Sequence, residues 1–367
     1  MILPIIIAIV IISSIAACLA GLLNIAEYFF ANYGPCEITI NDDRKFTVEG
    51  GEKLLSVLIN EKIFIPSACG GRGTCGLCKL KILEGGGTLL PTEEPYLEEY
   101  ERQNNVRISC QVKIREDIKI EIPEELLNIK EYSCKCIEIA DLTYDMKLFK
   151  FQLLEPDTID FIAGQYIQLL TPIYEKSGEE VYRAYSVASD ATQKNVIELI
   201  IRLMPGGICT TYCFEYLKVG DEIKLNGPYG DFRLSETNAP IVFIAGGSGM
   251  APINCLLHQM KNENINRNAV YYFGANTVND LFYLDEMKQF ESQLADFKFV
   301  PVVAAADKDD SWDSESGLVT QAVERNLKNA DQCEAYLCGS PGMIDASIEV
   351  LKKLGMNEKN IFFDKFE

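Results

Sequence analysis

Four cysteines in the N-terminal third of the chain have a spacing that suits iron–sulfur chemistry. Cys69, Cys75 and Cys78 form the pattern C-x5-C-x2-C, and Cys110 follows in V-R-I-S-C. A [2Fe–2S] cluster needs four thiolates, three of which can come from one tightly bent loop. Glycines permit such a bend and let backbone amides approach the sulfurs, and the loop contains Gly70, Gly71, Gly73 and Gly76.

The main alternative for these thiols is a structural zinc site. Zinc sites of this kind usually pair two C-x2-C units, and this sequence has only one. The loop departs by one residue from the plant-type spacing C-x4-C-x2-C, but looser loops occur in electron-transfer reductases. The flanking strand–helix–strand pattern agrees with a β-grasp ferredoxin. We therefore expect a [2Fe–2S] cluster whose metal ligands are Cys69, Cys75, Cys78 and Cys110.

Residues 183–186, R-A-Y-S, carry the side chains that a flavin needs. Tyr185 offers a flat ring, Ser186 a hydroxyl for the flavin N5 and Arg183 a cation for the phosphates. Alternation along a strand puts Arg183 and Tyr185 on one side and Ala184 and Ser186 on the other. Taken alone, these four residues fit an ordinary strand equally well.

A second segment supports the flavin interpretation. The run G-G-I-C-T-T-Y at 206–212 opens a helical pattern with small residues, whose free amides suit a pyrophosphate. Gly207 and Cys209 are therefore candidate contacts of FAD. The run G-P-Y-G-D-F at 227–232 and a barrel-like strand pattern strengthen the prediction of an FAD site.

A glycine-rich turn further along the chain indicates a dinucleotide site. The run I-V-F-I-A-G-G-S-G-M-A-P at 241–252 joins a buried strand to a helix that begins near Pro252. Such a turn lets a dinucleotide approach the backbone at a helix N-terminus. The spacing is not G-x-G-x-x-G, so that fingerprint is absent. The candidate contacts in the turn are Gly246, Gly247, Ser248 and Gly249.

A later run, Y-L-C-G-S-P-G-M at 336–343, places Cys338 and Gly339 at the carboxyl edge of the same sheet, where ligands of such folds bind. A 2′-phosphate would need a cation after the strand at 269–274, yet no Lys or Arg occurs there before Lys288. The sequence therefore favours NADH over NADPH.

Three successive stretches of the chain are predicted to form the strands and helices that position these residues. Strands and short helices alternate over 36–122, with one helix capped by Thr92, and 123–130 looks like a linker. From 131 to about 233, short strand patterns predict a closed antiparallel barrel with a single helix at 210–217. From 240 on, strands and helices alternate as in a doubly wound α/β sheet. The domains are predicted as 33–128, 129–236 and 237–367.

Residues 1–32 are predicted to form a transmembrane anchor. Residues 2–23 carry no charge, and a helix of that length rises about 33 Å, enough for about 30 Å of hydrocarbon. No Lys or Arg precedes Arg44, whereas a signal peptide needs a basic start. The flanks therefore favour a retained anchor, although they do not set its orientation.

Composition excludes several functions. The net charge of −20 disfavours binding to nucleic acid. The single histidine, His258, excludes metal sites built on several histidines and any Ser-His hydrolase that does not use it. The thirteen cysteines are interpreted mostly as reduced thiols or metal ligands, because a core of this size does not need disulfides.

The order of these motifs over residues 34–367 resembles the ferredoxin–NADP reductase superfamily with a fused [2Fe–2S] domain. With its N-terminal segment, the chain looks like the family of F subunits of sodium-translocating NADH:quinone oxidoreductases. The resemblance implies that the four cysteines ligate the cluster, that Arg183, Tyr185, Ser186 and Thr210 hold FAD, and that Gly246 to Gly249 and Cys338 border NADH. It makes Ser186 and Cys338 the catalytic candidates and, through a shared D-x-F ending, Phe366 a further cofactor contact.

The resemblance also implies a location in the bacterial inner membrane, with the soluble domains in the cytoplasm. Electrons would pass from NADH through FAD and the cluster to membrane-embedded redox subunits in the lipid bilayer, and finally to quinone. A flavin is needed because NADH gives two electrons together and the cluster accepts one at a time. Two alternatives stay open: an NADH-dependent reductase component of an oxygenase, and a carrier or assembly factor without NADH turnover.

Overall fold

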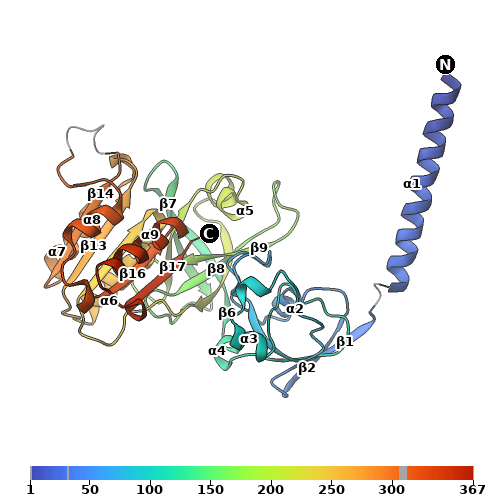
Figure 1. The fold of residues 1–367 in the computed structure, drawn as a ribbon, viewed down its shortest axis with the longest axis horizontal. Coiled ribbons are helices and arrows are strands. Elements are labelled where there is room, and N and C mark those ends of the chain that lie inside the picture. The colour runs from blue at the N-terminus through green and yellow to red at the C-terminus, as the bar shows by residue number, and fades with distance from the viewer. Residues whose placement is uncertain (1, 31–32, 306–311, 367) are drawn as a thin grey trace. The chain divides into compact units, whose positions relative to one another are not determined.

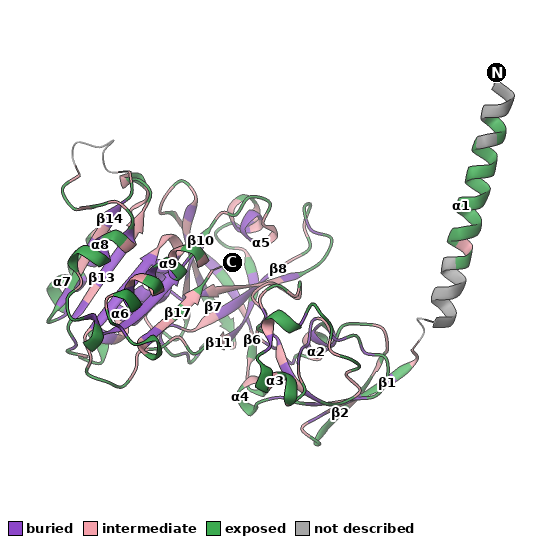
Figure 2. Cartoon of the chain, viewed as in Figure 1, coloured by how far each residue is buried: buried purple, intermediate pink, exposed green. Residues whose placement is uncertain are grey.

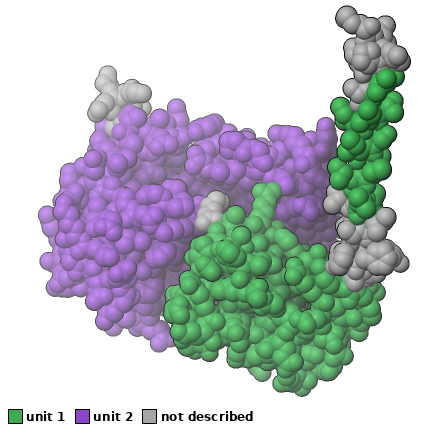
Figure 3. All heavy atoms as spheres, turned by 45° about the vertical axis from the view of Figure 1, so that its right-hand side comes forward, with its two compact units in different colours: residues 1–128 green, residues 129–367 purple. Residues whose placement is uncertain are grey.

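The computed structural model describes residues 2–30, 33–305 and 312–366, and it divides into two compact units, Met1–Asn128 and Ile129–Glu367 (Figures 1 and 3). The first unit begins with helix α1 (Ile2–Phe30), on which side chains such as Ile9, Ile12 and Leu22 are exposed (Figure 2). Within the described residues, no helix meets the combined length and hydropathy of a membrane span. The single-pass anchor therefore stays a prediction.

The rest of the first unit is a five-stranded mixed sheet in the order β2-β1-β5-β3-β4. Only the contact between β1 and β5 is parallel. Helix α2 packs on the sheet through Leu54, Leu55 and Leu58, which are fully buried. The elements are β1 (Pro35–Ile40), β2 (Arg44–Glu49), α2 (Leu54–Asn60), β3 (Lys79–Glu84), η1 (Glu94–Tyr96), α3 (Glu99–Gln103), β4 (Val106–Ile108), β5 (Ile118–Glu121) and α4 (Glu124–Leu127).

The predicted helix cap at Thr92 is wrong. Helix α3 begins after Glu98, whose backbone and side chain form a reciprocal capping box with Glu101. The Thr92 hydroxyl donates instead to Oε1 of Gln111 at 3.4 Å. The 3₁₀ turn η1 lies between Thr92 and the helix, so the two are further apart in the chain than the sequence pattern suggested.

The second unit starts with a six-stranded antiparallel sheet in the order β10-β7-β6-β11-β8-β9. An antiparallel bridge between Val187 and Leu199 joins its two edges just beyond β9, so the sheet closes as the predicted barrel. A helical turn, α5 (Ile208–Thr211), continues into a π-helical turn, η2 (Tyr212–Tyr216). The strands are β6 (Lys130–Asp141), β7 (Met146–Glu155), β8 (Tyr166–Thr171), β9 (Val181–Ser186), β10 (Val196–Arg202) and β11 (Glu222–Tyr229).

The remainder is a parallel sheet in the order β15-β14-β13-β12-β16-β17 with helices on both faces (Figure 1). Helices α6 and α7 pack against Phe243 and Tyr271, and helices α8 and α9 pack against Val242 and Ile244. The elements are β12 (Ile241–Gly246), η3 (Gly247–Gly249), α6 (Met250–Asn262), β13 (Ala269–Ala275), η4 (Val278–Asp280), α7 (Leu284–Gln293), β14 (Phe297–Val303), β15 (Glu315–Ser316), α8 (Val319–Asn326), η6 (Ala330–Gln332), β16 (Glu334–Gly339), α9 (Pro341–Lys353), η7 (Glu358–Asn360) and β17 (Ile361–Lys365).

Two strands were missed by the sequence patterns, β15 and the C-terminal β17. Strand β17 pairs with β16 along its whole length, from Ala335 opposite Ile361 to Gly339 opposite Lys365. The apolar core is continuous from the barrel into the parallel sheet, and Phe149, Leu199 and Phe243 are among its fully buried members. This shared core holds the barrel and the parallel sheet together within the second unit.

Candidate functional site

The four predicted cluster ligands lie as two pairs of thiols. The Cys75 thiol lies 3.4 Å from the Cys69 sulfur, and Cys78 is hydrogen-bonded to Cys110. The hydrogen bond from Cys75, and then backbone N–H groups such as that of Thr74, lower the pKa of Cys69 to about 3. The hydrogen bond from Cys78 likewise lowers the pKa of Cys110, to about 7, while the pKa values of Cys75 and Cys78 are raised.

The loop around Cys69, Cys75 and Cys78 is possible only with glycine at particular positions. Gly73 and Gly76 have φ values of +79° and +67°, in the left-handed region. A Cβ on Gly76 would lie 2.7 Å from the Tyr96 side chain, and a Cβ on Gly73 would lie 2.3 Å from Nε2 of Gln111. Any larger residue would therefore be strained by the backbone conformation and would have to move Tyr96 or the Gln111 amide aside.

The described residues contain no group of three or more His, Cys, Asp or Glu that is close enough to hold a single metal ion. Two pairs of thiols are nevertheless what two irons require, because each iron of a Cys₄ [2Fe–2S] cluster takes two cysteines. The thiol arrangement therefore fits a two-iron cluster better than a zinc ion, which would need its ligands around one point.

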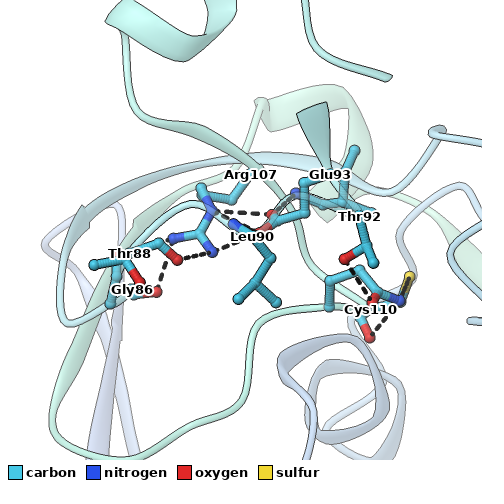
Figure 4. A network of polar contacts seen from close by, with 10 residues as sticks. Gly86, Thr88, Leu90, Thr92, Glu93, Arg107 and Cys110 are labelled. Carbon is cyan, nitrogen blue, oxygen red and sulfur yellow. Dashed lines mark hydrogen bonds and ion pairs between the residues drawn. The ribbon is translucent and has the colours of Figure 1, made fainter. Parts of the chain in front are cut away.

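A buried ion pair fixes the strand that leads to Cys110. Arg107 donates to Glu93 in a bidentate contact of 2.6–3.2 Å, and both side chains are buried (Figure 4). The guanidinium also donates to the carbonyl oxygens of Gly86 and Thr88. Every polar atom of the two side chains has a partner, so the ion pair holds the loop around residues 86–93 against strand β4.

The predicted flavin residues lie on β9, next to β8. Tyr185 is opposite Ile167, and Ser186 is opposite Tyr166. Burial raises the pKa of Tyr185, whose hydroxyl is hydrogen-bonded to Cys209, so its ring is neutral and fixed. Arg183 is half-buried and donates to the carbonyl of Tyr182 at 2.7 Å.

The loop before α5 borders a cavity of about 260 Å³. Gly206, Gly207 and Thr211 line it together with Tyr174, whose hydroxyl donates to the Ile208 carbonyl at 2.7 Å. The Thr210 hydroxyl lies under this turn and contacts the backbone of Met204 and Gly207 rather than the cavity. Thr210 and Cys209 thus shape the turn from beneath, while the glycines face the open space.

Sequence reasoning missed Asp364, which the C-terminal strand brings to the flavin strand. The Ser186 hydroxyl donates to Oδ2 of Asp364 at 3.4 Å, across 178 residues of sequence. Burial raises the pKa of Asp364 to about 6, and the hydrogen bond from Ser186 opposes this rise. The Phe366 amide donates to the Gly339 carbonyl at 2.8 Å and holds the end of the chain against β16.

The glycine turn after β12 meets β16 at the carboxyl edge of the sheet. A Cβ on Gly249 would lie 2.2 Å from the Cys338 carbonyl oxygen, so this glycine is required by the protein's own packing. A Cβ on Gly246 would lie 3.1 Å from both the Gly274 carbonyl oxygen and Sδ of Met343, which is a tight contact but not an overlap. Burial raises the pKa of Cys338, and Asp364 raises it further, so the thiol is neutral at pH 7.

Arg202 is a second residue that sequence reasoning missed. It ends β10, and its Nη1 would lie 4.0 Å from a Cβ on Gly247. Asp145 holds the guanidinium through a 2.7 Å contact from Nε. Arg202 of the barrel thereby places a positive charge beside the turn 246–249, which contains no basic residue of its own.

The segment that follows β13 carries an acidic side chain and, before Lys288, no basic one. Asp280 accepts hydrogen bonds from the amide and hydroxyl of Thr277 at 2.8 and 2.9 Å. A larger cavity of about 430 Å³ lies beside His258, but among the described residues it includes none of the predicted site. Burial lowers the pKa of His258, in agreement with a packing role.

Three family models match the chain. They are the 2Fe-2S iron-sulfur cluster binding domain over residues 38–115, the oxidoreductase FAD-binding domain over residues 133–234 and the oxidoreductase NAD-binding domain over residues 243–348. The chain thus contains all three expected types of domain in the expected order.

Two bacterial proteins resemble the whole chain. The F subunit of the Na(+)-translocating NADH-quinone reductase of Neisseria meningitidis is 33% identical over 402 residues, covering 99% of both chains. The F subunit of the same enzyme of Idiomarina loihiensis is 33% identical over 390 residues, covering 95% of both.

Two solved structures have a similar fold. The cytochrome P450 reductase GcoB of Amycolatopsis matches with a TM-score of 0.71 and 27% identity, covering 90% of this chain and 98% of its own. The ferredoxin reductase in carbazole 1,9a-dioxygenase matches with a TM-score of 0.69 and 25% identity, covering 91% and 98%.

Proposed function

Because the chain belongs to the family of F subunits of the Na(+)-translocating NADH-quinone reductases, we propose that it is the electron-input subunit of such an enzyme. It is an oxidoreductase with FAD-binding, NAD-binding and [2Fe–2S] domains. The observation that carries the proposal is the presence of all three domains on one chain that matches these subunits over its full length. In the proposal, electrons leave the cluster for membrane-embedded redox subunits and finally reach quinone.

When bound, FAD can take an electron pair from NADH and release electrons singly to the cluster, which is chemistry that no side chain supplies. The protein's part is to place and polarise these groups. Tyr185 presents a neutral ring for the flavin to stack on, and Arg183 brings positive charge toward its phosphates. The glycines around Gly207 leave room for the pyrophosphate beside the helical turn.

Ser186 and Asp364 can hold a proton next to the flavin. A carboxyl group whose pKa lies near 6 exchanges its proton readily at cytoplasmic pH, and the Ser186 hydroxyl connects it to the flavin strand. Cys338 lies beside them as a neutral thiol at the sheet edge, where the nicotinamide would stack.

The NADH site is proposed at the turn of Gly246 to Gly249. Gly247 leaves space for the pyrophosphate, and Arg202 supplies a positive charge from the barrel. Asp280, after β13, would repel a 2′-phosphate, which supports the preference for NADH. The site would therefore form only when the barrel and the parallel sheet are packed together.

We also place the protein at the bacterial inner membrane, with α1 as a single membrane pass and the soluble domains in the cytoplasm. The uncharged stretch 2–23 supports this proposal, as does the likeness to subunits of an enzyme named for translocating Na⁺. NADH is a cytoplasmic metabolite, so the soluble domains belong on that side.

The test uses the purified full-length protein, loaded with its flavin and cluster. Rapid mixing with NADH should bleach the flavin absorbance and then produce the paramagnetic signal of a reduced [2Fe–2S] cluster. NADPH at the same concentration should react more slowly. A protein with bound flavin that NADH does not bleach would rule out the proposal and favour a role without NADH turnover.

A second candidate function is supported by the solved structures. The two similar folds belong to reductases named for a cytochrome P450 and for a carbazole dioxygenase. A reductase component of an oxygenase would have the same three soluble domains. Membranes that contain the protein distinguish the two functions, because NADH oxidation should then depend on quinone rather than on an oxygenase substrate.

A further inference from the structure

The thiols of the predicted cluster differ in their polar surroundings. Among the described residues, Cys69 and Cys75 receive hydrogen bonds from backbone N–H groups, and Cys69 also accepts one from the Cys75 thiol. Cys78 receives one from the Cys110 backbone, and Cys78 and Cys110 in addition have polar side chains beside them, on the residues that flank Cys110. Polar hydrogens that point at the sulfurs of a cluster stabilise its more negative, reduced state and so raise its potential.

Gln111 is oriented toward Cys110 by contacts on both ends of its amide. Nε2 lies 3.5 Å from the Cys110 sulfur, and Oε1 accepts a hydrogen bond from the Thr92 hydroxyl at 3.4 Å. Gly73 leaves the space that the amide occupies, because a Cβ there would overlap Nε2. Thr92 is itself next to Glu93, which the ion pair to Arg107 holds in place (Figure 4).

Ser109 provides a second polar hydrogen. Its side chain is fully buried, and its hydroxyl makes no hydrogen bond to any other described residue. A buried hydroxyl without a partner is unfavourable, so such a group calls for an explanation. The Ser109 amide donates to the Cys78 carbonyl oxygen at 2.8 Å, which places residue 109 directly beside Cys78.

We propose that Ser109 and Gln111 set the reduction potential of the cluster, by directing a hydroxyl and an amide hydrogen at the sulfurs of Cys78 and Cys110. Thr92 acts as a positioning residue, because its hydroxyl keeps the Gln111 amide from flipping. The inference rests on the [2Fe–2S] cluster of the proposed function. Beyond that function, the pair Cys78 and Cys110 is the one through which the chain adjusts the reduction potential.

The test is an anaerobic redox titration of the full-length protein, followed through the paramagnetic signal of the reduced cluster. Ser109→Ala and Gln111→Ala should each shift the midpoint potential to a more negative value, and the double variant should shift it further. Thr92→Val should give a smaller shift in the same direction, and Thr92→Ser should restore the wild-type value. Ser56→Ala and Thr88→Val, at exposed positions of the same unit, are the matched controls and should leave the potential unchanged.

Cluster content is measured first in every variant. Wild-type protein that holds no [2Fe–2S] cluster would refute the proposed function itself. Fully loaded Ser109→Ala and Gln111→Ala variants with the wild-type potential would overturn only the present inference. If burial makes Ser109→Ala unstable, the half-buried Gln111 and the exposed Thr92 decide the outcome, because unchanged potentials in both would refute the assignment.

Discussion

A single residue, Asp364, should make the stability of the folded protein depend on pH. Its folded pKa of about 6 exceeds the ordinary value of 3.8, so the folded state retains a proton that the unfolded chain releases between pH 4 and 6. Stability should therefore fall as pH rises through this window. Asp364→Asn removes this effect and should stabilise the protein at pH 7 by at most about 3 kcal/mol, less where water reaches the carboxylate.

Thermal unfolding at pH 5 and pH 7 checks this prediction. The wild type should lose more of its Tm between these two values than Asp364→Asn does. Asp345→Asn, at an exposed position of α9, serves as the control and should behave as the wild type. Equal pH dependence in Asp364→Asn and wild type would contradict the raised pKa.

Arg202 should contribute to NADH binding through its place beside Gly247. A hydrogen bond between a guanidinium and a phosphate contributes about 1.5–3 kcal/mol, so Arg202→Ala should raise the KM for NADH roughly tenfold to a hundredfold. The maximal rate of dye reduction should change little at saturating NADH. Steady-state kinetics against Arg115→Ala, an exposed arginine of the other unit, test this, and an unchanged KM would remove Arg202 from the site.

At the scale of elements, the buried pair of Glu93 and Arg107 holds strand β4 to the preceding loop. Glu93→Gln leaves the guanidinium buried without an opposite charge, and removing one partner of such a pair destabilises a fold by about 3–5 kcal/mol. The variant should unfold at a lower temperature and retain less cluster. Lys45→Ala breaks an exposed pair with Glu37 and should change stability by about 1 kcal/mol or less. If both variants lost a similar amount of stability, the burial of the Glu93–Arg107 pair would not explain its contribution.

At the scale of the whole molecule, the predicted anchor can be separated from the chemistry. Deleting residues 1–32 should leave NADH-driven reduction of a soluble dye intact, because the deletion leaves both folded cores in place. Reduction of quinone in membranes should be lost, since the cluster domain would no longer stay at the bilayer. The two activities are measured on the same preparations, and full quinone reduction by the truncated protein would refute the anchoring role.

The sequence alone predicted the parts of this protein that depend on local spacing. The cysteine and glycine spacing of the loop at 69–78, the R-A-Y-S strand and the turn at 246–249 predicted cofactor-binding domains that the family models confirm. Hydrophobic periodicity likewise predicted the barrel and the parallel sheet. These features are readable because a tight turn or an alternating strand is specified by neighbouring residues.

Only the tertiary structure decided which distant side chains complete the sites. Strand β17 brings Asp364 to Ser186, the end of β10 brings Arg202 to the glycine turn, and the loop before β4 brings Thr92 to Gln111. None of these contacts follows from spacing, because each depends on strand order and on the packing of separate elements against one another.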